Sequence, residues 1–165
     1  MYQRKTNIFR WLVTAMVAAA LVLSAGLAFG FKAKTQQTAS AAANYDVTFG
    51  EHNTVTEIQD TIQSWLTGGF MADGDTLTVT GTKTGADASV TLSIPVNKRV
   101  IWKAELSGNS NLTFFVIDGG GVFDVAGGKI ENLGNGYAIF INSSGNVTVS
   151  GGTVSAPNST AINIT

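Results

Sequence analysis

The stretch “VAGGKIEN” at 125–132 returns 24 residues later as “VSGGTVSA” at 149–156. Both stretches run through an apolar residue, a small residue, two glycines, a polar residue and a β-branched apolar residue, so that Val125 corresponds to Val149. Internal repetition with a period of about 20–50 residues is typical of solenoids, in which each repeat packs on the previous one.

The same interval connects other apolar positions. Leu106, Ile130 and Val154 form a series with steps of 24 residues, and Phe115 is followed at the same distance by Ile139. The segments “YAIFIN” and “TAINIT” match at a shift of 23, which indicates one residue fewer in the intervening turn. Strand families that share one period predict that corresponding side chains stack in columns.

From residue 76 onward, apolar residues alternate with polar ones, as at Leu77 and Val79. Short apolar or β-branched runs are separated by Gly, Asn, Ser and Asp, with no helical pattern between them, which indicates an all-β fold. The later runs lie at 90–94, 100–102, 112–117, 122–125, 137–141, 147–149 and 161–164. An antiparallel sandwich of similar hairpins also explains the alternation, but it does not explain a period that several strand families share.

The repeats therefore predict a parallel β-helix over 76–165, with three strands in each coil of about 24 residues. The glycine pairs at 127–128 and 151–152 then mark one corner in successive coils, where a positive φ is available. Replacing these glycines with valine is expected to be far more harmful than a change at Thr153.

Residues 1–43 have the pattern of a secretory signal peptide, with its apolar helix and processing region. Residues 1–10 carry three bases and no acid, residues 11–31 carry no charge, and Ala39-Ser40-Ala41 offers the small residues that a signal peptidase reads. An uncleaved transmembrane anchor is the alternative, because about 20 apolar residues can cross a bilayer. Both alternatives predict that the rest of the chain is secreted or lies at the cell surface, and the N-terminal segment is its only expected membrane contact.

Residues 44–75 are expected to form a short strand that ends in a turn, at 44–53, and a capping helix, at 54–66. Thr54 and Glu57 have capping-box spacing. The predicted apolar face consists of Val55, Ile58, Ile62, Trp65 and Leu66, and the predicted polar face of Gln59, Asp60 and Gln63. We expect the apolar face to cover the first coil, because the end of a solenoid needs a cap.

The charge and cysteine content exclude several classes of protein. After residue 43 the chain has five lysine or arginine residues and eleven acids, so its net charge is −6. No basic stripe is left to neutralise phosphates, which disfavours nucleic-acid binding. Because the chain has no cysteine, disulfides, a cysteine-linked lipid and thiolate metal sites are all excluded.

Two sequence features resemble known proteins. “TEIQDTIQSWL” followed by “DGDTLTV” (56–79) resembles the entry of pectin-lyase-like right-handed β-helix proteins. “TLSIPVNKRVIWKAELSG” (91–108) and “VTVSGGTVSAPNSTAINI” (147–164) resemble repeats of large secreted surface proteins of anaerobic, mostly Gram-positive bacteria. The resemblance implies a right-handed coil, an extracellular location and an association with glycans or cell-wall polysaccharide. Because such surface proteins are long, it also implies that this chain is the N-terminal part of one.

Candidate chemistry centres on carboxylates. Asp118, Asp124 and Glu131 are the acids of the coil region that fit catalysis by a pair of carboxylates, which must face each other across the substrate. The candidate bases are Arg99, Lys103 and Lys129. The alternative, which we favour, is that these charges are solvated outward positions or turn caps.

Other candidate sites are weaker. Trp102 and Trp65 are able to stack on sugars if they are exposed, and we expect Trp65 to pack under the cap. “DGD” at 73–75 lacks the remaining ligands of a calcium loop and is interpreted as a turn. His52, the single histidine, has no partner for a triad or a zinc site. No metal or cofactor is expected.

The leading hypothesis is a secreted, non-catalytic β-helix module that acts as a scaffold or an adhesive surface, with weak ligand-site candidates at Trp102, Asp118 and Asp124. A polysaccharide lyase or glycoside hydrolase on the same fold is the alternative. Because “TAINIT” stops partway through a coil, its unpaired strand edges predict end-to-end self-association if no further coil follows.

Overall fold

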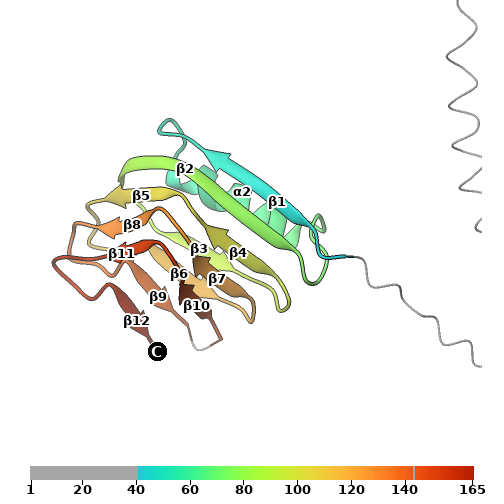
Figure 1. The fold of residues 1–165 in the computed structure, drawn as a ribbon. Coiled ribbons are helices and arrows are strands. Elements are labelled where there is room, and N and C mark those ends of the chain that lie inside the picture. Colours follow the sequence, from blue (N-terminus) through green and yellow to red (C-terminus); the bar gives the residue numbers. More distant parts are fainter. Residues whose placement is uncertain (1–40, 143) are drawn as a thin grey trace, which may run out of the picture. The chain divides into compact units, whose positions relative to one another are not determined.

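The computed structural model describes residues 41–142 and 144–165, which form a parallel β-solenoid of about four turns (Figure 1). Every strand pair in this part of the chain is parallel, which confirms the parallel coil and excludes the antiparallel sandwich. The signal segment predicted at 1–43 lies outside the described residues, apart from its last three. Within the described ranges, no helix has the length and apolarity needed to cross a membrane.

Twelve described strands build three sheets. Sheet A contains β1, β2, β4, β7 and β10; sheet B contains β2, β5, β8 and β11; sheet C contains β3, β6, β9 and β12. The strands are β1 (Asn44–Phe49), β2 (Thr76–Ala86), β3 (Val90–Ser93), β4 (Arg99–Trp102), β5 (Glu105–Gly108), β6 (Phe115–Asp118), β7 (Val122–Val125), β8 (Lys129–Asn132), β9 (Ile139–Ile141), β10 (Asn146–Val149), β11 (Thr153–Ser155) and β12 (Ile162–Ile164). The long strand β2 continues through the corner at Gly81, which has a φ of +124°, and so joins sheets A and B.

The predicted columns are present. Leu106, Ile130 and Val154 are register partners in β5, β8 and β11. Phe115 pairs with Ile139, and the register then continues to Ile162 with the predicted shift of 23. Full burial, which Leu106, Ile130, Phe115 and Ile139 reach, is worth about 1.5–3 kcal/mol for each side chain, whereas Val154 and Ile162 in the last coil are only partly buried. The spacing read from the sequence is therefore the register of the coil.

The glycine corner differs in part from the prediction. Gly128 has a φ of +62°, and a Cβ added there would lie 2.1 Å from the carbonyl oxygen of Ala104. Gly152 occupies the equivalent corner one coil later without a positive φ, although its added Cβ would lie 2.6 Å from the carbonyl oxygen of Gly127. The close approach of backbones thus recurs at this corner, whereas the left-handed conformation does not.

The helix near the start of the described residues, α2, runs from Val55 to Thr67. Its N-cap is Thr54, whose hydroxyl accepts a hydrogen bond from the Glu57 N–H at 3.2 Å, while the Glu57 carboxylate accepts one from the Thr54 N–H at 2.9 Å. This is the predicted capping box. The buried side chains of the helix are Val55, Ile58, Ile62 and Leu66.

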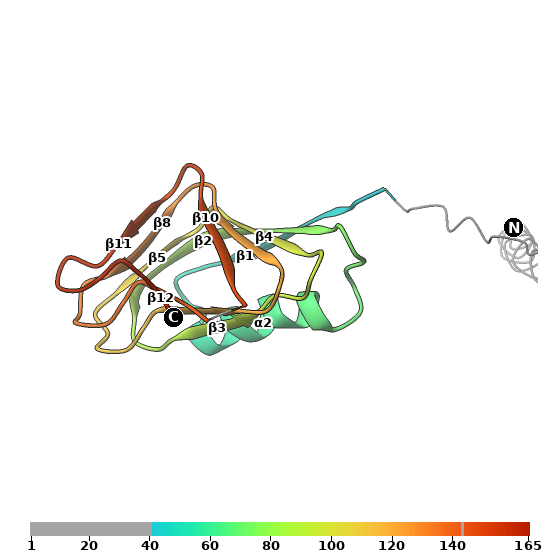
Figure 2. The same ribbon diagram turned by 90° about the horizontal axis from the view of Figure 1, so that it is seen from below.

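Two glutamines assigned to the polar face of α2 are not directed only to solvent. Gln59 Oε1 accepts a hydrogen bond from the N–H of Thr91 at 2.7 Å. Gln63 accepts from the N–H of Ser93 at 3.0 Å and donates to its carbonyl oxygen at 3.1 Å. β3 is the edge strand of sheet C at this end, and α2 lies beside it (Figure 2). The side-chain amides of Gln59 and Gln63 therefore occupy backbone groups of β3 that would otherwise be open to another strand.

The corresponding edge of sheet B is covered by the turn after β1. The strand predicted within 44–53 ends at Phe49, and a turn follows it. In this turn the Glu51 carboxylate accepts hydrogen bonds from the N–H and the hydroxyl of Thr84 at 2.9 and 3.1 Å. Lys83 Nζ donates to the Glu51 carbonyl oxygen at 2.9 Å. In sheet A, β1 pairs with β2. At this end, the exposed edge of each sheet is therefore hydrogen-bonded, either to another strand or to polar side chains.

Candidate functional site

Trp102 is not a surface residue, which corrects its prediction as a ligand contact. It lies on the inward side of β4 and is completely buried. Its ring packs against those of Phe115, Phe49 and Phe123, with centroid distances of 4.9, 5.7 and 6.1 Å. Its indole N–H has no hydrogen-bond partner among the described residues. Trp102 is therefore part of the core.

Asp124 is also not available to a ligand, and its prediction as a contact is corrected. The residue is on the outer side of β7 but is only 5% exposed. Its Oδ2 accepts a hydrogen bond from Arg99 at 2.7 Å, and its Oδ1 accepts one from the Ser150 hydroxyl at 2.8 Å. Since Arg99 and Ser150 belong to the coils before and after it, Asp124 links three coils and both of its oxygens are occupied.

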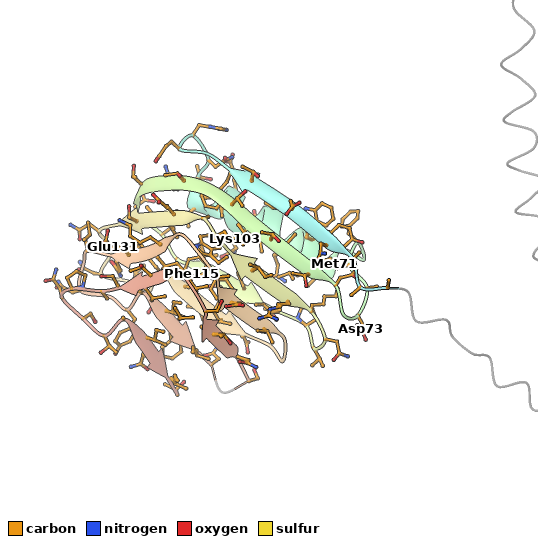
Figure 3. The ribbon with its side chains drawn as sticks, in the orientation of Figure 1. Met71, Asp73, Lys103, Phe115 and Glu131 are labelled. Atoms are coloured by element: carbon orange, nitrogen blue, oxygen red, sulfur yellow. The ribbon has the colours of Figure 1, made fainter. Side chains whose placement is uncertain are left out.

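The other charges of the coil region do not form a catalytic pair. Lys129 Nζ lies 2.8 Å from Oε2 of Glu131, and Figure 3 labels Glu131 on sheet B. The hydrogen bond and the charge of Glu131 raise the pKa of Lys129, with a further contribution from Glu105. A lysine that holds its proton more firmly is a poorer general base. Lys103 is exposed, at the corner between β4 and β5.

Asp118 has a different environment, at the end of β6 on the outer side of sheet C. Its Oδ1 accepts hydrogen bonds from the Ser144 hydroxyl and from the Gly119 N–H, both at 2.7 Å. These bonds, Ser144 first, lower the pKa of Asp118, and the Asn142 side chain lowers it further. No hydrogen bond from the described residues reaches Oδ2. Asp118 is thus an ionised carboxylate that is partly exposed and whose two hydrogen bonds from the described residues share one oxygen.

Two aromatic side chains that the sequence analysis did not single out stack on each other at β9, the strand that pairs with the strand of Asp118. The rings of Tyr137 and Phe140 are nearly parallel, with centroids 6.4 Å apart and an angle of 16° between their planes. Phe140 is the register partner of Val116, two residues before Asp118 on the same side of β6. Diagonal neighbours of this kind are about 7–8 Å apart in a sheet. On its other side, Phe140 pairs with Asn163.

Asp118, Tyr137, Phe140 and Asn163 are called here the Asp118–Phe140 face. The signal for it was present in the sequence, because Phe140 alternates with Ile139 and Ile141, which belong to an inward column. The outward residues of the four strands of sheet C are Thr91, Ser93, Val116, Asp118, Phe140 and Asn163. Among these described positions Asp118 carries the only charge, so the face lacks the second carboxylate that glycoside hydrolysis uses.

The “DGD” turn is explained by its role in the fold. The Asp75 carboxylate accepts hydrogen bonds from the N–H groups of Ala43 and Ala72, both at 2.7 Å, which lower its pKa. Asp73 accepts a hydrogen bond from the Asn97 side chain at 3.3 Å. Across 41–142 and 144–165, no three His, Cys, Asp or Glu side chains are grouped closely enough to hold a metal ion.

A second aromatic cluster lies where α2 meets β1. The Trp65 ring is 5.1 Å from that of Tyr45 and 5.5 Å from that of Phe70, between centroids. Trp65 is half-buried, as expected for a residue that packs under the helix, and Phe70 is 63% exposed. These rings pack α2 against β1, and this packing explains the cluster.

Comparison with known proteins adds no assignment: no family model, curated protein or solved structure matches this chain. The parallel β-solenoid is observed directly in the structure. The pectin-lyase-like family and the secretory pathway remain predictions from the sequence.

Proposed function

We propose that this chain is a secreted or cell-surface β-solenoid module that contacts glycans without transforming them. Phe140, whose ring stacks with that of Tyr137, is the diagonal neighbour of Asp118, and the hydrogen bonds that Asp118 accepts from the described residues both end on Oδ1; this juxtaposition carries the proposal. A sugar ring has apolar C–H faces that pack on aromatic rings, and its hydroxyl groups donate to carboxylates and accept from amides. The Asp118–Phe140 face offers all of these contacts on one surface.

The remaining charges support a scaffold more than an enzyme. Asp124 and Arg99 hold successive coils together, and Lys129 is paired with Glu131. A polysaccharide lyase or hydrolase of the pectin-lyase-like type needs such groups to be free to transfer protons. In our proposal the coil is right-handed and belongs to that family by fold, and its surface is used for binding.

Within this proposal, residues 44–75 act as the N-terminal cap. The buried face of α2 covers apolar core, and Gln59 and Gln63 occupy the edge of β3. Glu51 does the same for the edge of sheet B. A solenoid whose first edges are covered resists edge-to-edge association at that end.

The test is a glycan-array screen with the secreted chain, followed by titration of the best ligand with two variants. Phe140→Ala should weaken binding roughly tenfold or more, which corresponds to about 1.4 kcal/mol. Phe70→Ala is the matched control, because it removes an exposed ring far from this face in the sequence and in a different cluster. The proposal is wrong if the chain binds no glycan, or if both variants bind as the wild type does.

A further inference from the structure

The charge of the Asp118–Phe140 face limits which glycans fit. Asp118 is the single charged residue among the outward positions of the described sheet C strands, and no described lysine or arginine balances it there. The chain after residue 43 has a net charge of −6, so the surrounding field is negative as well. Glycans that carry carboxylates, sulfates or phosphates would place like charges together at this face.

The same arrangement favours a positive group. A protonated amine hydrogen-bonds strongly to an ionised carboxylate, and Asp118 Oδ2 accepts no hydrogen bond from the described residues. An ammonium group is also attracted to the face of an aromatic ring within about 6 Å. Phe140 is the diagonal neighbour of Asp118, so the two attractions act on one region of the ligand.

We infer that the Asp118–Phe140 face binds amino-sugar glycans, in which hexosamine units carry a free ammonium group. This inference rests on the proposed function and adds the class of ligand. In this arrangement the sugar ring stacks on Phe140, the ammonium group lies against Asp118 Oδ2, the neighbouring ring of Tyr137 extends the aromatic surface away from Asp118, and Asn163, the register partner of Phe140, supplies an amide for hydroxyl groups.

Neither of the other two candidate carboxylates of the coil region offers the same combination. Asp124 has both oxygens bonded, to Arg99 and Ser150. Glu131 is paired with Lys129, whose positive charge would repel an amine. The preference for amino sugars should therefore depend on Asp118.

The experiment compares three oligosaccharides of equal length with the full secreted chain: oligomers of β-linked glucosamine, their fully N-acetylated counterparts, and oligogalacturonate. Titrations are done at a mildly acidic pH, at which the amines are protonated, and at about 0.15 M salt to screen distant charges. We expect the glucosamine oligomer to bind at least tenfold more tightly than the N-acetylated one, and oligogalacturonate to bind most weakly.

Two variants separate the local contact from general charge. Asp118→Asn keeps Oδ1 as an acceptor for Ser144 and Gly119 but removes the charge, so the preference for the free amine should disappear. Asp46→Asn makes the same change of charge at an exposed position on β1, and the preference should persist.

The outcomes distinguish the two proposals. If the N-acetylated or the acidic oligomer binds at least as tightly as the free amine, and Phe140→Ala still weakens that binding, the amino-sugar inference is wrong and the glycan-binding function stands. An equal loss in the Asp118 and Asp46 variants also overturns the inference, because it indicates non-specific attraction. If none of these oligomers binds and the array is blank, the proposed function itself fails.

Discussion

Asp118 and Asp124 are six residues apart in the chain, and both point outward from the coil, yet their environments differ. Asp124 is 5% exposed and bonds with both oxygens to Arg99 and Ser150. Asp118 is half-buried, its two hydrogen bonds from the described residues end on one oxygen, and Phe140 is its diagonal neighbour. Asp124 links neighbouring coils through its hydrogen bonds, whereas the carboxylate of Asp118 is partly exposed to solvent.

The difference comes from the position of each residue along its strand. Asp124 lies within β7, between β4 and β10, so that donors from the previous and the next coil reach it from both sides. Asp118 is the last residue of β6, where the chain turns at Gly119 with a φ of +86°. At a corner the carboxylate has one bonded side and one side that faces solvent. Outward polar side chains within a strand therefore find hydrogen-bond partners in the neighbouring coils more readily than those at a corner.

The largest expected effect is on the core that both aspartates share. Trp102 contacts Phe115 on the strand of Asp118 and Phe123 on the strand of Asp124. Trp102→Ala should lower the free energy of unfolding by about 3–5 kcal/mol, because it opens a cavity at a fully buried site. Urea denaturation of the chain measures this change. Trp102→Phe should cost much less, since it retains most of the ring and removes a buried N–H that lacks a partner. Equal costs for the two variants would show that the packing around Trp102 is not as described.

A smaller effect is expected at Asp124. Asp124→Ala removes the acceptor of Arg99 and of the Ser150 hydroxyl, and should lower the free energy of unfolding by about 1–3 kcal/mol. Glycan affinity should be unchanged, because this residue is on sheet A. The matched variant is Asp118→Ala, which should lower affinity and have the smaller effect on stability. If Asp118→Ala destabilises the chain as much as Asp124→Ala, the contrast between the two residues is wrong.

The smallest effect is the pH dependence that Asp118 adds to stability. Its pKa is lowered in the folded chain, so its ionised form is stabilised by folding. This contribution is present in full above the ordinary aspartate pKa of about 3.9, and it is lost as the pH falls through the lowered folded value. The free energy of unfolding should therefore fall less steeply below about pH 4 in Asp118→Asn than in the wild type. Denaturation curves at several pH values provide the comparison, and parallel pH profiles would contradict this role of Asp118.

The sequence was sufficient for the columns but not for the orientation of Trp102. Extending the 24-residue period backward from Val125 would place Ile101 in the inward column and Trp102 outward. In the structure Val125 pairs with Trp102, a shift of 23, and Ile101 pairs with Asp124. Because side chains alternate with a period of two, a register change of one residue transfers Trp102 from the surface to the core. The length of a turn, which the repeat pattern does not give for a single coil, decides this.

One feature of the Asp118–Phe140 face could be predicted from the sequence. The spacing of Phe115 and Ile139 is the true register of β6 and β9, and it places Asp118 and Phe140 on the same outer side. The hydrogen bond between Asp118 and Ser144 could not be predicted, because Ser144 lies 26 residues later, in the corresponding corner of the next coil, where the 24-residue period does not place it. The same is true of Gln59 and Gln63, whose polar character indicated solvent but whose amides bond the edge of β3.

By itself, the sequence determined the parallel coil, its period, the column of Leu106, Ile130 and Val154, and the helix with its capping box. These follow from local periodicity and from repetition, both of which a linear chain displays directly. The tertiary structure decided which outward side chains the fold uses for itself and which it leaves free. That choice depends on donors about one coil away, whose distances are set by the bends at the corners and by the exact length of each turn.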